Sequence, residues 1–121
     1  MAGEIEKLDR FLDSRGEWIK IRRTVGSANI DVDCRAFVRG YSPGELVGSI
    51  TQQDSLVILS PTQINKAQWP GGQPIGSKID ARIPTLVKKD TAIIAGAQRA
   101  VQAGVGIYKD GELVRIELQV R

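Results

Sequence analysis

The sequence predicts a mainly β protein, a small antiparallel β-barrel or sandwich with a short N-terminal helix and a long loop rich in proline and glycine. Apolar and polar residues alternate along much of the chain, which is the pattern of strands with one buried face. Tight-turn signals separate these stretches, and Asp110-Gly111 is the clearest of them. Aromatic residues make up only 5% of the chain. The expected core therefore consists of Val, Ile, Leu and Ala, whose β-branched members favour sheet.

Length and composition limit the class of protein. A chain of 121 residues has the length of one domain with a modest core. The net charge of +3 comes from basic residues dispersed among acidic ones, which is a weak signal for direct nucleic-acid binding. The N-terminus shows no apolar signal segment, and no stretch approaches the roughly 18 apolar residues of a membrane span. Synthesis in the cytoplasm and no membrane partner are expected.

Residues 1–15 are expected to contain a helix. Apolar residues between positions 3 and 14 recur at spacings of three and four, which places them on one helical face. Glu4 and Glu6 stand in the first turn, where the helix dipole favours negative charge, and Gly16 is expected to end the helix. The helix is predicted to pack on the domain or, alternatively, to dock on a neighbouring subunit, through Ile5, Leu8, Phe11 and Leu12.

Residues 17–60 and 87–121 are expected to supply the strands. In the first of them Ile19 and Ile21 face one way, and a turn with Gly26 and Asn29 leads into the next. That next strand alternates most strictly, and its expected buried face consists of Ile30, Val32, Cys34, Ala36 and Val38.

Further strands are expected at 46–50 and 55–60, with residues 51–54 as a hairpin turn between them. Asp54 is expected to bond the backbone of that turn. After Asp110-Gly111 the chain alternates again, which predicts a C-terminal strand with an inward face of Val114, Ile116, Leu118 and Val120.

Residues 61–86 differ in composition from the predicted strands, because they contain four of the five prolines. One or two helical turns are expected near the start, with Thr62 as the N-cap. The rest has no usable periodicity, and a loop of this length in a compact domain is usually functional. We therefore expect an extended assembly loop that orders on a partner, or alternatively a loop that only confers solubility. Trp69 is expected to be an exposed interface anchor or a plug for the end of the barrel.

The candidate residues of this loop are basic. With Trp69, the expected assembly or channel-facing residues in or beside it are Lys66, Lys78, Arg82, Lys88 and Lys89.

Residues that could carry catalysis are few. The chain has no histidine, which excludes triads and other histidine-based acid–base chemistry. Cys34 is expected to be a buried, inert thiol, and Asp31 and Asp33 to be a solvated strand face or salt-bridge partners rather than a cation site. The segment "GGQPIGSK" lacks the order and the flanking strand and helix of a phosphate loop, and "GVGIYKDG" enters a hairpin rather than a helix. No catalytic residue, metal or cofactor is expected.

Four segments carry a resemblance to a known family. "GEWIKIRR" after the helix, "ITQQDSLVILSP", the basic Pro/Gly-rich loop and the ending "GELVRIELQVR" together resemble the head–tail joining (head-completion or stopper) neck proteins of tailed phages. The resemblance follows the order of elements over nearly the whole chain. One departure is Lys89-Asp90, where this family would lead us to expect a glycine-containing turn.

The resemblance implies a non-enzymatic β-barrel subunit that assembles into a six-fold or twelve-fold ring in the virion neck. Such a ring closes the DNA exit and provides the platform on which the tail docks. Its partners would be a portal or adaptor protein above, a tail terminator or tail tube protein below, and packaged DNA nearby in the channel. The loop at 61–86 would rearrange on assembly, and the strands and the N-terminal helix would make the ring contacts.

Two other classes stay open. A tail-terminator ring protein has a similar size but typically an α/β sheet with more helix. A host β-barrel module that binds peptide or single-stranded nucleic acid would need aromatic side chains in stacking positions, for which the candidates are Phe37, Tyr41 and Tyr108.

Overall fold

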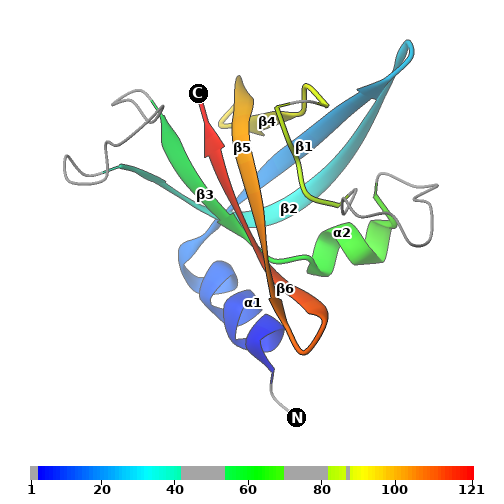
Figure 1. The fold of residues 1–121 in the computed structure, drawn as a ribbon. Helices are drawn as coiled ribbons and strands as arrows, with labels where there is room; N and C mark the ends of the chain where they lie inside the picture. The colour runs from blue at the N-terminus through cyan, green and yellow to red at the C-terminus, as the bar shows by residue number, and fades with distance from the viewer. Residues whose placement is uncertain (1–2, 42–53, 70–81, 87) are drawn as a thin grey trace.

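The computed structural model describes residues 3–41, 54–69, 82–86 and 88–121, and it confirms the predicted fold class. The described strands form a closed antiparallel barrel with the order β1-β2-β3-β6-β5-β4 around its wall (Figure 1). In chain order the elements are α1 (Glu4–Arg15), β1 (Glu17–Val25), β2 (Ala28–Gly40), β3 (Ser55–Leu59), α2 (Thr62–Ala67), β4 (Thr91–Ile94), β5 (Ala97–Lys109) and β6 (Glu112–Val120).

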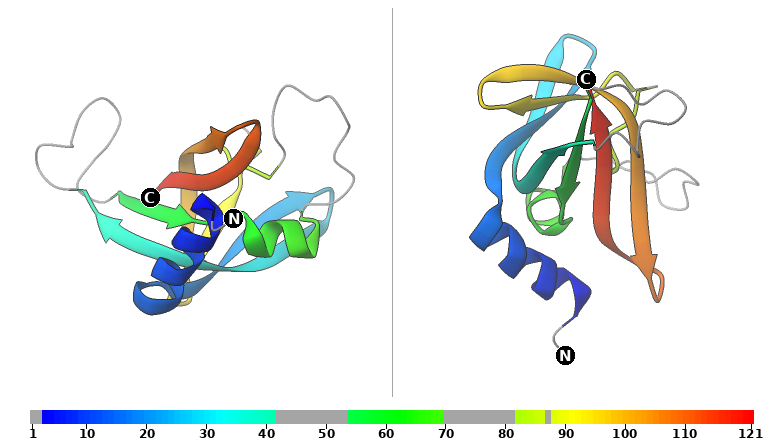
Figure 2. Two further views of the ribbon diagram at one scale, coloured as in Figure 1. Left: turned by 90° about the horizontal axis from the view of Figure 1, so that it is seen from below. Right: turned by 90° about the vertical axis from the view of Figure 1, so that its left-hand side faces the viewer.

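Two antiparallel meanders, β1–β2–β3 and β4–β5–β6, make the wall. β3 pairs with β6 from Ser55 to Leu59, whereas the closing seam between β1 and β4 spans only Lys20 to Arg22. The long strands therefore extend past their short neighbours. The β1–β2 hairpin projects at one end of the barrel, and the β5–β6 hairpin points the other way, toward α1 (Figures 1 and 2).

The hairpin turns match their local sequence. Asp110 and Gly111 both have positive φ, 52° and 78°, which is the predicted type I′ conformation. The turn from β4 to β5 has the same signs of φ at Ala95 and Gly96, 51° and 81°. The turn from β1 to β2 is shorter than expected, because only Gly26 and Ser27 lie outside the strands.

The barrel interior is filled by the apolar face of every strand. The predicted inward faces of β1 and β2 are confirmed, with Ile30 and Val38 partly buried at the margins of the core. Side chains with no exposed surface in this core are Ile21, Cys34, Ala36, Val57, Leu59, Ile64, Ala92, Val101, Ile116, Leu118 and Val120.

The inward face of β6 differs from prediction at one position. Ile116, Leu118 and Val120 are buried as expected, but Leu113 is buried in place of Val114. Tyr108 pairs with Leu113 and Ile107 with Arg115, so Val114 is an extra residue in the ladder. Such a bulge reverses which side chains face inward, and this is why the strict alternation failed there.

Two glycines of β5 make room for the segment at 82–86. A methyl group on Gly104 would overlap the carbonyl oxygen of Pro84, and one on Gly106 would overlap the side chain of Ile83. The glycines of "GVG" therefore allow close packing against β5, and they lie in a hairpin strand as the sequence predicts.

Gly104→Ala is expected to lower the free energy of unfolding by about 1–3 kcal/mol, because the added methyl group must displace the backbone at Pro84. Gly40→Ala is the matched control, since a methyl group there meets nothing within 4 Å. Denaturant titration of both variants measures the difference. Equal unfolding midpoints for the two variants would contradict the packing described here.

The end of α1 is tied to β2. The N–H of Gly16 donates to the carbonyl oxygen of Leu12 at 2.8 Å, and a methyl group on Gly16 would press on the carbonyl of Ala36. Arg35 donates from Nη2 to the carbonyls of Leu12 and Gly16, at 2.7 and 3.0 Å, and so places positive charge at the helix C-terminus. Neither helix in the described part of the chain combines the length and apolar character needed to cross a membrane.

The polar side chains of Asp54 and Thr62 both contact distant parts of the chain. Asp54 is buried and accepts hydrogen bonds from Gln119 and Arg121, at 2.6 and 2.8 Å, so it anchors the C-terminal strand. The expected strand at 46–50 and most of the turn at 51–54 lie outside the described residues. The N-cap of α2 is Pro61 rather than Thr62, whose hydroxyl instead donates to Asp9 of α1 at 2.6 Å.

Candidate functional site

The segment expected to be one long loop, residues 61–86, is packed on the barrel at both described ends. Ile64 and Trp69 belong to the core, Pro84 is buried, and Ile83 packs against the core. The expectation of an extended arm is thus wrong for these ends, because their apolar side chains find burial on the domain itself. Residues 70–81, and with them the candidate Lys78, lie outside the described residues.

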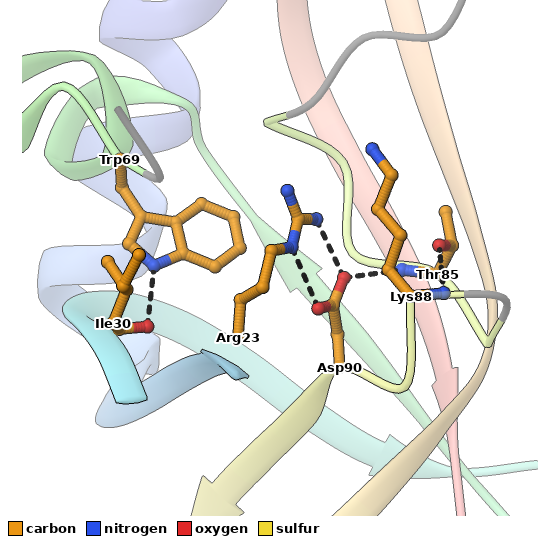
Figure 3. A network of polar contacts seen from close by, with 6 residues as sticks. All are labelled: Arg23, Ile30, Trp69, Thr85, Lys88 and Asp90. Atoms are coloured by element: carbon orange, nitrogen blue, oxygen red, sulfur yellow. Dashed lines mark hydrogen bonds and ion pairs between the residues drawn. The ribbon is translucent and has the colours of Figure 1, made fainter. Parts of the chain in front are cut away.

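Trp69 is a plug rather than an exposed anchor. Its side chain is 3% exposed, and its indole N–H donates to the carbonyl oxygen of Ile30 at 2.9 Å. The guanidinium carbon of Arg23 lies 4.7 Å from the ring centroid, which is the geometry of a cation–π contact (Figure 3). Of the two interpretations of Trp69, the buried one is confirmed.

Arg23 also forms a buried ion pair with Asp90, and Figure 3 shows the guanidinium between the indole and the carboxylate. Two hydrogen bonds of 2.9 and 2.7 Å join them, and their side chains are 7% and 0% exposed. Asp90 also accepts from the backbone N–H of Thr85 at 2.9 Å. The cluster therefore joins β1, the residue before β4 and both described ends of the 61–86 segment. It was not predicted from sequence.

Of the basic candidates among the described residues, Lys66 and Lys89 are exposed, whereas Arg82 and Lys88 are half-buried. Lys66 is exposed on α2, and Arg82 donates to the side chain of the neighbouring Asn65 at 2.8 Å. The amine of Lys88 points away from the Asp90 carboxylate (Figure 3). Lys89 is exposed and has a φ of 57°, which is the left-handed conformation that favours glycine. The family resemblance led us to expect a glycine-containing turn at this position.

The apolar stripe of α1 packs on the outer face of the barrel but is only partly covered. Leu12 is fully buried, Ile5 and Leu8 are half-buried, and Phe11 is 42% exposed. The rings of Phe11 and Phe37 meet with centroids 5.3 Å apart. The prediction that the helix packs on the domain is confirmed, and part of its apolar face remains open.

A groove of about 580 Å³, called the helix groove below, runs between α1 and the outer face of the barrel. Most of its lining residues are apolar, and among them Ile107 has a side chain that is 39% exposed. Its apolar lining consists of Leu8, Phe11, Phe37, Ile58, Ile107 and Val114, and its charged lining, called its rim below, consists of Glu4, Lys7, Arg115 and Glu117.

A second groove of about 660 Å³ lies between α2 and β2, where the side chain of Trp18 is 60% exposed. Asp31 and Asp33 belong to its lining. Asp31 forms an ion pair with Arg22 at 2.9 Å, and the hydrogen bond from Arg22 lowers the pKa of the Asp31 carboxyl. The salt-bridge interpretation of Asp31 is confirmed. Among the residues that the structure describes, no three metal-binding side chains come together.

Cys34 behaves as an inert core residue. It lies in the barrel interior with no exposed surface, and burial raises the pKa of its thiol to about 12. The thiolate is the nucleophilic form of cysteine, and it does not form near neutral pH at such a pKa. This placement agrees with the sequence interpretation.

Comparison with known proteins adds no relationship: no family model, no curated protein and no solved structure matches this chain.

Proposed function

We propose that the chain is a non-enzymatic structural subunit of a tailed-phage neck. It forms a ring at the head–tail interface, closes the DNA exit and provides the platform on which the tail docks. The observation that carries the proposal is a barrel filled by its own side chains with open apolar surface on its outside. Leu59, Ile116 and Leu118 occupy the interior. On the outside, Phe11 of α1 and Ile107 of β5 are partly exposed to solvent. Open apolar surface of this kind supports contacts with other proteins.

The sequence resemblance supports the same proposal, because it implies a β-barrel subunit, and the chain folds as a barrel preceded by a short helix. The barrel departs from the α/β sheet typical of a tail terminator. For a single-strand binding module, stacking aromatics are needed on an open face. Phe37 instead packs against Phe11 of α1, and Tyr108 stands on the separate β5–β6 hairpin.

In this proposal the subunit belongs to the virion and meets a portal or adaptor protein on one side and the tail terminator or tail tube on the other. A six-fold or twelve-fold ring places packaged DNA in the channel. The exposed amines of Lys66 and Lys89 are available for contact with an acidic partner or with DNA.

The proposal is tested by removing the gene from the phage that encodes it. We expect lysates to contain separate tails and heads that have failed to join, and we expect purified protein to restore joining when it is added. Heat-unfolded protein is the control for the addition. Normal numbers of infectious particles without the protein would refute the proposal.

A further inference from the structure

The helix groove has the composition of a binding site for an uncharged, apolar segment. Phe11 and Ile107 expose about two-fifths of their surface in it, 42% and 39%. The charges at its rim are largely paired already: Glu4 lies 3.3 Å from Lys109, and Arg115 lies 2.8 Å from Glu117. Covering paired charges with an uncharged segment avoids burying a new, unpaired charge.

In the described part of the chain, three hairpins connect neighbouring strands of the barrel, and their tips differ in charge and in exposed apolar surface. The β5–β6 tip carries Lys109, Asp110 and Glu112. The β1–β2 tip, residues 24–29, contains no charged residue, and Val25 near its end is 56% exposed. The β4–β5 tip, Ala95-Gly96, is also uncharged, but no large apolar side chain is exposed there. Of these three tips, only the β1–β2 tip therefore combines an uncharged sequence with a large exposed apolar side chain, as an apolar groove requires. The remaining rim cation, Lys7, can donate to the carbonyl oxygens that a turn presents.

The tip and the groove lie at opposite ends of the molecule. Beyond Arg22, β1 no longer pairs with β4, and the hairpin extends away from the barrel. Figures 1 and 2 show the tip far from α1 in two perpendicular views. The tip of one chain therefore cannot reach its own groove, and a contact between the two requires a second copy.

We propose that the helix groove binds the β1–β2 tip of a second copy of this chain, with Val25 seated against Phe11 and Ile107. The contact is head to tail, because one copy supplies the tip and the next supplies the groove. Head-to-tail contacts generate rings when the rotation closes. The closed ring rests on the proposed neck function, whereas the pairwise contact stands on the geometry of the chain alone.

Sedimentation of the purified protein tests the contact. We expect self-association with a dissociation constant of about 1 mM or tighter. Val25→Glu and Ile107→Glu should each weaken it at least about tenfold, since each places a charge in an apolar contact. Val105→Glu is the matched control, because Val105 lies on the same strand, is 57% exposed and does not line the groove. It should change the constant by less than about twofold.

Mixing the two weakened variants distinguishes a head-to-tail contact from a symmetric dimer contact. Val25→Glu retains an intact groove and Ile107→Glu an intact tip, so the mixture should form one-to-one dimers and nothing larger. A protein that stays monomeric to about 1 mM overturns the contact. So does equal weakening by Val105→Glu, or a mixture that does not associate. A virion ring joined through other surfaces also overturns it and leaves the neck function intact, whereas absence from the virion refutes only the neck function.

Discussion

Trp69→Ala is expected to lower the free energy of unfolding by about 3–5 kcal/mol, the range for removing a large aromatic side chain from a core. Trp69 is 3% exposed, and its removal also eliminates the hydrogen bond to Ile30 and the ring contact with Arg23. Trp69→Phe keeps a ring over Arg23 but loses the indole N–H, so we expect a smaller loss. Denaturant titration measures both.

Trp18→Ala is the control for this prediction, because the second tryptophan is 60% exposed on the outside of β1. Its removal is expected to cost about 1 kcal/mol or less, mostly through the contact with Arg35, whose guanidinium carbon is 5.5 Å from the ring centroid. Similar unfolding midpoints for Trp69→Ala and Trp18→Ala would mean that Trp69 does not plug the barrel in solution.

Asp90→Ala is expected to lower the free energy of unfolding by a similar amount, about 3–5 kcal/mol, because removing one partner of a buried ion pair is strongly destabilising. Arg23 would keep a 7% exposed side chain without its balancing carboxylate, and the N–H of Thr85 would lose its acceptor. Replacing both partners, as Arg23→Met with Asp90→Leu, is expected to recover much of the loss.

A neighbouring pair supplies the control. Arg22 and Asp31 make a similar ion pair on the outer face, where each side chain is 27% exposed. Asp31→Ala is expected to move the unfolding midpoint only slightly. Because the pKa of Asp31 is lowered in the folded state, its small contribution is present above the ordinary carboxyl pKa and is lost as the pH falls below it. If Asp90→Ala and Asp31→Ala have equal effects, the buried cluster does not stabilise the fold.

The alternation of apolar residues was sufficient to predict the barrel class and most of the inward faces. It failed at Val114, because a bulge is set by pairing with β5, and pairing partners are not visible in one strand's own sequence. The buried pair was detectable in part. Arg23 continues the inward series of Ile19 and Ile21, and Asp90 precedes Ala92 at the same spacing. Two opposite charges at inward positions are a signal of a buried ion pair.

The position of Trp69 could not be predicted in the same way. Its partner Ile30 lies 39 residues earlier in the chain, and local sequence around Pro70 indicates only a loop. Among the described basic candidates Lys66 and Lys89 are exposed and Arg82 and Lys88 are half-buried, and their role in assembly stays a prediction. The groove beside α1 depends on β2, β3, β5 and β6 together, so only the folded chain reveals it.

Electron microscopy of purified virions tests the proposed neck assignment most directly, because the proposal requires this chain to be part of a phage particle. We expect the six-stranded barrel to fit density for a ring between the portal complex and the tail, with copies related by six-fold or twelve-fold symmetry. Complete particles whose neck density is fully explained by other proteins would contradict the assignment.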